Sequence, residues 1–160
     1  MTGTPMLGFV EAIKKVVKDN YCNFNGRARR SEYWWYMLAV QAITWVLTLP
    51  LSINSINVMV EAIQLANQGA SPDQIAELQQ MSPMLNVFQA ISSLISFALL
   101  LPSLGVTVRR LHDIGKSGWY YLFCLIPCVG IILLLVWLAQ DSDKGANEYG
   151  ESPKYPSEAL

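Results

Sequence analysis

Two short clusters hold most of the side chains in this sequence that could do chemistry. The first runs from Asn23 to Trp34 and contains three arginines and a glutamate; the second runs from Arg109 to Trp119 and contains two arginines, a lysine, an aspartate and the single histidine. Arginine binds carboxylate and phosphate oxygens through paired hydrogen bonds, and glycine turns let backbone N–H groups approach an anion. We predict one charged network, whose members are Arg27, Arg29, Arg30, Glu32, Arg109, Arg110, His112, Asp113 and Lys116, with Gly26, Gly115 and Gly118 in its turns.

These residues offer little for catalysis or metal binding. His112 beside Asp113 could act as a general base, but no nucleophile accompanies them. We therefore expect no catalytic residue and favour a protein that is not an enzyme. Cys124 and Cys128 could bind a soft metal or be redox-active. Because they lack a third ligand and an activating charge, we expect them to pack as small apolar residues, and we expect no metal and no cofactor.

The elements that must position these clusters are apolar helices. Apolar residues make up 52% of the 160-residue chain and charged residues only 14%, against about 25% charged in a soluble domain. Three uncharged segments, at about 33–53, 84–108 and 119–139, are each long enough to cross a hydrocarbon layer of about 30 Å. Core helices of a soluble bundle would be shorter and would carry a polar face. We predict an all-α polytopic membrane protein with three transmembrane helices, forming a single membrane domain over 1–160.

The positive charges that flank these segments predict the orientation, because cytoplasmic flanks are rich in lysine and arginine. Six such residues precede the first segment, three lie between the second and third, and none lies between the first and second. The N-terminus and the second connection are therefore expected in the cytoplasm, and the C-terminal tail from Gln140 in the periplasm. Pro127 and Gly130 interrupt the third segment, which leaves open a re-entrant path with the tail inside.

Two further helical elements are expected outside the spans. Met6, Val10, Ile13 and Val17 recur at helical spacing with lysines between them, which is typical of an amphipathic helix at the membrane interface. An ordinary solvated helix packed on the protein fits the same pattern. The outer connection at 54–83 also has apolar residues at helical spacing and is expected to be largely helical.

Polar side chains inside the spans are expected to face other helices, since lipid cannot satisfy them. A transport path is the alternative, but it would normally include an ionisable residue at mid-membrane depth. None stands there in this sequence, so helix packing is the favoured interpretation. These residues are Gln41, Thr44 and Thr48 in the first span, and Gln89, Ser92, Ser93, Ser96, Ser103 and Thr107 in the second.

Three separated motifs together resemble one protein family. They occupy Phe24 to Trp34, Pro102 to Trp119 and Asp141 to Gly150. In this order and spacing they resemble the domain-of-unknown-function family 805 (DUF805), whose members are small bacterial inner-membrane proteins. The resemblance covers about residues 21–153. It implies a bacterial inner-membrane location and carries over no catalytic residue.

Three functions remain open from the sequence. The favoured one is a non-enzymatic structural or interaction protein whose arginine-rich cytoplasmic face contacts anionic lipid headgroups. The alternatives are a component of a small-solute transporter or channel and, less favoured, a membrane enzyme acting on lipid phosphates. Nucleic acid is not an expected partner, because the net charge is −1 and the isoelectric point is near 5.8, whereas nucleic-acid-binding domains are basic. Protein partners are not predicted, and homo-oligomers stay open.

Overall fold

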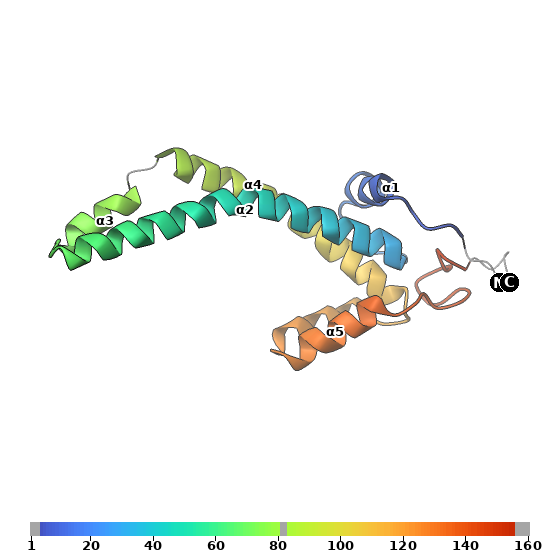
Figure 1. Cartoon of the computed structure of the whole chain (residues 1–160). Helices are drawn as coiled ribbons and strands as arrows, with labels where there is room; N and C mark the ends of the chain where they lie inside the picture. Colours follow the sequence, from blue (N-terminus) through green and yellow to red (C-terminus); the bar gives the residue numbers. More distant parts are fainter. Residues whose placement is uncertain (1–3, 81–82, 156–160) are drawn as a thin grey trace. The chain divides into compact units, whose positions relative to one another are not determined.

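The computed structural model describes residues 4–80 and 83–155, and the regular elements in this part of the chain are all helical (Figure 1). The chain divides into two compact units, Met1–Val40 with Leu99–Leu160, and Gln41–Ala98. The all-α class is therefore confirmed. In chain order the elements are α1 (Phe9–Lys14), the π-helical η1 (Lys15–Asp19), α2 (Arg30–Asn67), α3 (Pro72–Gln80), α4 (Pro83–His112), the 3-10 helix η2 (Gly118–Leu125) and α5 (Val129–Ala139).

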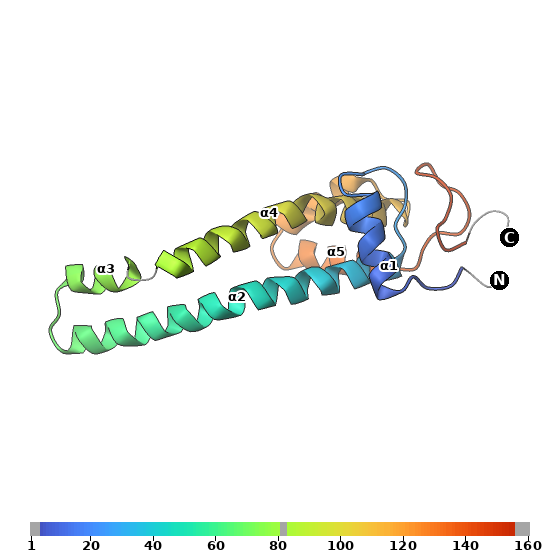
Figure 2. The same cartoon turned by 90° about the horizontal axis from the view of Figure 1, so that it is seen from above.

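Two of these helices are long and apolar enough to cross a bilayer. They are α2, with 38 residues, and the stretch Asn86–His112 of α4, with 27 residues. At about 1.5 Å per residue they are about 57 and 40 Å long, and both exceed the hydrocarbon thickness of about 30 Å. Up to Gln80, the outer connection expected at 54–83 consists of the continuation of α2, a turn and α3 (Figure 2); its positions 81–82 lie outside the described residues.

The third predicted span, at about 119–139, is not one continuous helix, in keeping with the interruption that Pro127 and Gly130 leave open. Between η2 and α5 the backbone leaves helical geometry, and Cys128 has a φ of 63°. The cause is local, because Pro127 has no N–H to donate to a helix. The 11 residues of α5 extend only about 16 Å, about half of the hydrocarbon thickness of about 30 Å.

Instead, η2 and α5 pack against each other as a hairpin. A Cβ atom built on Gly130 would lie 1.9 Å from the carbonyl oxygen of Phe123, so only glycine allows this approach. The rings of Phe123 and Trp137 meet edge to face with centroids 5.2 Å apart. These contacts close the hairpin on itself.

Hydroxyl groups within the long helices bond to their own backbone. Thr48 donates to the carbonyl of Thr44 at 2.8 Å, and the same i to i−4 bond recurs along α4. Two of these hydroxyls also make the interhelical contacts expected for them. Ser103 meets the hydroxyl of Tyr36 on α2 at 3.2 Å, and Thr107 forms a hydrogen bond with the side chain of Tyr33 on α2. The α4 donors are Ser92, Ser93, Ser96, Ser103 and Thr107.

The core of the first unit gathers side chains from the N-terminal segment, the start of α2, the end of α4 and α5. On the N-terminal segment, Ala12 and Val16 are buried, whereas Met6 and Val10 of the predicted amphipathic stripe are exposed. The stripe therefore does not face this core. The core cluster consists of Val16, Ala28, Tyr33, Tyr36, Val106, Leu111, Leu134 and Leu138.

Candidate functional site

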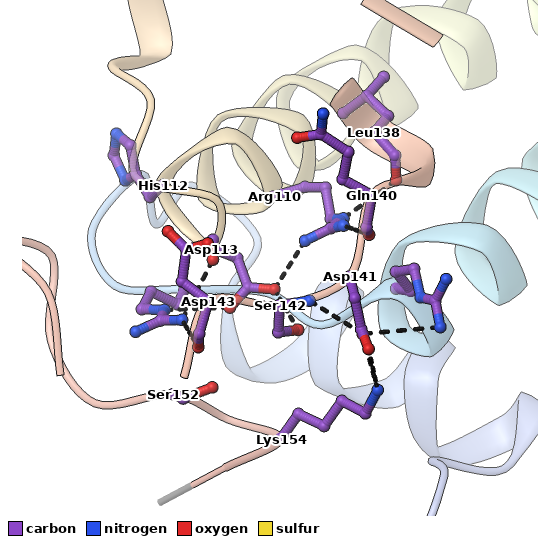
Figure 3. Close-up of polar contacts among 12 residues, drawn as sticks. Arg110, His112, Asp113, Leu138, Gln140, Asp141, Ser142, Asp143, Ser152 and Lys154 are labelled. Atoms are coloured by element: carbon purple, nitrogen blue, oxygen red, sulfur yellow. Dashed lines mark hydrogen bonds and ion pairs between the residues drawn. The ribbon is translucent and has the colours of Figure 1, made fainter. Parts of the chain in front are cut away.

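Asp113, which directly follows α4, is the centre of a buried ion cluster (Figure 3). Its Oδ1 accepts a hydrogen bond from Nε of Arg27 at 3.0 Å, and its Oδ2 accepts one from Nη1 of Arg110 at 2.6 Å. The hydroxyl of Ser142 also donates to Oδ2. The three charged side chains are at most 1% exposed, so both carboxylate oxygens are satisfied without solvent.

Arg27 also binds the C-terminal tail. Its Nη1 donates to the carbonyl oxygen of Gly145 at 2.8 Å, and its Nη2 donates to that of Asp143 at 2.7 Å. The amide of Asp143 in turn donates to the carbonyl of Asp113 at 3.0 Å. These contacts bring the tail onto the same surface as the segment that precedes α2.

His112 binds the tail as well, through stacking. Its ring lies on that of Tyr149 with centroids 3.8 Å apart and 3° between the planes. Its Nδ1 is 3.2 Å from the carbonyl of Gly26, and its own carbonyl accepts a hydrogen bond from Asn147 at 2.9 Å. His112 is therefore held between two loops, and it serves to connect them through these contacts.

Arg110 and Arg30 bind the carboxyl end of α5. Arg110 donates from Nε to the carbonyl of Leu138 at 3.1 Å and from Nη2 to that of Gln140. Arg30 donates to the carbonyl of Ala139 at 3.3 Å. The last carbonyls of a helix lack intrahelical partners and carry partial negative charge, so these guanidinium groups stabilise the end of α5.

Glu32 forms a second ion cluster. Its side chain is fully buried; Oε1 accepts from Nη1 of Arg109 at 2.8 Å, and Oε2 lies 2.7 Å from the ammonium group of Lys15. The carbonyl of Arg109 accepts from the amide of Ala28 at 2.9 Å. The predicted network thus divides into two ion clusters, which we call the Asp113 centre and the Glu32 centre.

The remaining predicted residues have other contacts. Arg29 donates to the carbonyl of Pro5 at 2.6 Å and so fixes the N-terminal segment. Lys116 lies over the ring of Trp137, 4.7 Å from its centroid. Gly26 and Gly115 have φ angles of 82° and 67°, a region that favours glycine. A Cβ on Gly118 would lie 2.8 Å from Val108.

Sequence reasoning missed Lys15, Ser142 and the backbone groups of the tail as members of these centres. In the sequence, Lys15 is marked only as one of the lysines of the amphipathic segment. The third motif, from Asp141 to Gly150, held the signal for the tail, because it combines polar side chains with the glycines whose carbonyls Arg27 binds.

Two aspartates of this region, Asp113 and Asp141, have pKa values that are shifted in opposite directions. Burial raises the pKa of Asp113, and the hydrogen bond from Ser142 and the charges of Arg110 and Arg27 work against that rise. Partial burial also disfavours the charge of Asp141, but the hydrogen bond from Lys154, the amide of Ser142 and the charge of Arg30 outweigh it and lower the pKa to about 2. Asp113 therefore depends on its buried partners to stay ionised, whereas Asp141 is held charged at the surface.

Most of the predicted arginines are not exposed. Arg27, Arg29, Arg109 and Arg110 are between 0 and 7% exposed, whereas the Arg30 side chain is 47% exposed and lies 3.6 Å from Asp141. Most of these arginine side chains therefore form their contacts inside the protein. Within the described residues, no group of three or more histidine, cysteine, aspartate or glutamate side chains is arranged to hold a metal ion.

Long apolar helices that end in a charged surface with paired buried ions are typical of a helical integral membrane protein. This chain belongs to the family described as "Protein of unknown function (DUF805)", whose model matches residues 21–151. The resemblance seen in the three motifs is therefore confirmed.

Two relatives place this family in the bacterial inner membrane. The chain is 33% identical over 141 residues to "Inner membrane protein YhaI" of Escherichia coli (strain K12), covering 88% of this chain and 94% of the relative. It is 31% identical over 140 residues to "Inner membrane protein YhaH" of the same strain, covering 88% and 93%. No solved structure matches this chain. The protein is accordingly a bacterial inner-membrane protein.

Proposed function

We propose that this protein is a non-catalytic structural or interaction component of the inner membrane. One observation carries the proposal: both carboxylates of the site and four of its arginines are buried and bonded within the chain. Ions held in this way stabilise a fixed arrangement, since removing either partner would leave the other charged and desolvated. The arrangement joins the start of α2, the end of α4, the end of α5 and the tail.

We further propose that α2 and α4 span the membrane, that η2 and α5 form a re-entrant hairpin, and that both chain ends lie in the cytoplasm. The lysines and arginines around the two centres support the cytoplasmic side. The short α5 supports the hairpin, and the hydrogen bonds from Arg27 to the tail support the common side of the two ends. The periplasmic tail expected from alternation of three spans is thereby replaced.

The proposed contact with anionic lipid is limited to cations outside the buried centres. Lys14, Lys18 and Arg30 are exposed, and each basic side chain near an anionic leaflet contributes about 1 kcal/mol to membrane attraction. The apolar Val10 and Val17 on the same segment are also exposed. This segment therefore presents both basic and apolar side chains, the combination that binds a membrane interface.

Lipid co-purification tests this contact. We would replace Lys14 and Lys18 together by glutamine, purify the full chain in mild detergent, and quantify the retained phosphatidylglycerol relative to phosphatidylethanolamine. The expected result is a loss of anionic enrichment of up to about fivefold per cation, which corresponds to about 1 kcal/mol each. The matched control replaces the exposed Gln64 and Gln68 by alanine and should leave the enrichment unchanged. Equal enrichment in both variants would remove headgroup contact from the proposal.

A further inference from the structure

A cavity of about 440 Å³ lies in the first unit, outside both ion centres. One wall is a face of α4 and the other is η2, with the loop residues Phe24 and Asn25 at its side. Its volume is within the range of small-molecule sites, about 300–1,000 Å³. Its lining residues are Phe24, Asn25, Leu104, Val108, His112, Ser117, Gly118, Trp119, Tyr121 and Leu122.

The lining changes from apolar to polar along α4. Leu104, Val108 and His112 are spaced four residues apart and therefore lie on one side of the helix. His112 ends the helix beside the charged surface, and Leu104 lies about 12 Å deeper along the helix axis. Polar groups, from Asn25 and Ser117, accompany the His112 end. An occupant must therefore be apolar at one end and polar at the other.

The polar end suits uncharged groups. Apart from His112, the lining residues have no ionisable group at neutral pH, so a phosphate or ammonium buried there would lack a counter-charge. The side-chain amide of Asn25 has hydrogen-bond donors of the kind that ester carbonyls accept. The hydroxyl of Ser117 accepts from the Trp119 amide at 3.4 Å and bonds to Tyr149, so it adds polar character to this end of the cavity.

We propose that this cavity binds one glycerophospholipid, with its ester-linked glycerol at the His112 end and an acyl chain along Val108 and Leu104. In a bilayer the ester groups lie between the phosphates and the chains, the same order as the lining presents. Trp119 is 78% exposed at the polar end, as expected for an aromatic residue at the interface. The site goes beyond the headgroup contacts of the proposed function and does not depend on Lys14 or Lys18.

Native mass spectrometry of the full-length protein tests the site with phosphatidylglycerol added after delipidation. Leu104→Trp and Leu122→Trp fill the cavity from its two walls. Both should weaken the tightest lipid-binding event at least tenfold. The matched controls are Leu101→Trp on α4 and Leu125→Trp on η2, at exposed positions outside the cavity, and they should bind as the wild type does.

A second measurement tests the ester groups. An ether-linked phosphatidylglycerol of equal chain length should bind more weakly than the ester-linked lipid to the wild type. Thermal melting of each variant confirms that the cavity-filling tryptophans leave the fold intact, and two walls are used so that one misfolded variant does not end the test. Equal lipid binding by the cavity and control variants would overturn the site. Equal binding of the ether-linked and ester-linked lipids would overturn the placement of the ester groups at the polar end of the cavity.

Discussion

Replacing Asp113 by asparagine isolates the contribution of the buried carboxylate, because the two side chains have nearly the same shape. In the native protein, Asp113 accepts hydrogen bonds from Arg27 and Arg110, both of which are buried with it. Asparagine keeps one carbonyl oxygen but turns an NH₂ donor toward guanidinium donors. It also leaves two buried positive charges without their counter-ion.

The expected cost follows from the loss of one member of a buried ion cluster, about 3–5 kcal/mol. The matched control is Asp73→Asn, since Asp73 is an exposed acid in the first turn of α3. Its loss removes only a favourable charge at a helix N-terminus, about 0.3–1 kcal/mol. For a chain of this size, 1 kcal/mol shifts the melting temperature by about 2–4 °C.

Melting in detergent, followed by tryptophan fluorescence, compares the two variants directly. We expect Asp113→Asn to melt roughly 6–20 °C below the wild type and Asp73→Asn within about 4 °C of it. A melting temperature of Asp113→Asn equal to that of the Asp73 control would refute the reasoning. The charged turn would then contribute to membrane orientation but not to stability.

Two further predictions test the hairpin and the tail. Gly130→Ala should destabilise the protein by about 1–3 kcal/mol, although alanine is the better helix former, because its Cβ would overlap the carbonyl of Phe123. The control Gly8→Ala, whose added Cβ meets nothing closer than 3.7 Å, should melt as the wild type does. A Gly130→Ala variant of unchanged or higher stability would contradict the hairpin packing. Lys154→Gln should raise the pKa of Asp141 from about 2 toward 3.8, measured by carboxyl ¹³C NMR. A carboxyl group whose pKa is lower in the folded than in the unfolded state stabilises the folded protein at pH values above the unfolded-state pKa. The contribution of Asp141 to stability should therefore be complete above about pH 4 and be lost in the wild type as the pH falls through about 2. An unchanged pKa of Asp141 in the variant would show that Lys154 does not cause the lowered pKa.

The sequence predicts which residues form the charged surface better than it predicts their partners. Charge excess around apolar segments identifies Arg27 and Asp113, because hydrocarbon excludes unpaired ions and concentrates them at its edges. The assignment of Asp113 to Arg27 and Arg110, and of Glu32 to Arg109 and Lys15, depends on how loops fold back. The spacing of residues along the chain does not predict the distances between loops in the folded protein.

The third apolar segment shows why hydropathy alone does not determine on which side of the membrane the tail lies. Hydropathy measures apolar content, and a re-entrant hairpin has the same content as a crossing helix. Pro127 and Gly130 indicate a break, but the close packing of Gly130 on Phe123 determines that the chain reverses there. The cytoplasmic tail that we propose follows from that reversal. The hydroxyls of α4 are a similar case, since their sequence spacing fits an interhelical bond and a bond to the preceding turn equally well.

Cysteine labelling of the tail tests the central claim, that the buried centres hold both chain ends on the cytoplasmic surface. In a background with Cys22, Cys124 and Cys128 replaced by serine, Lys144→Cys and Gln68→Cys place single thiols at exposed positions of the tail and of the turn after α2. Spheroplasts are treated with a membrane-impermeant maleimide before and after lysis. We predict that the Gln68→Cys thiol reacts in intact spheroplasts and that the Lys144→Cys thiol reacts only after lysis. Labelling of the Lys144→Cys thiol in intact spheroplasts would contradict the account, because a periplasmic tail could not bind Arg27 on the cytoplasmic side.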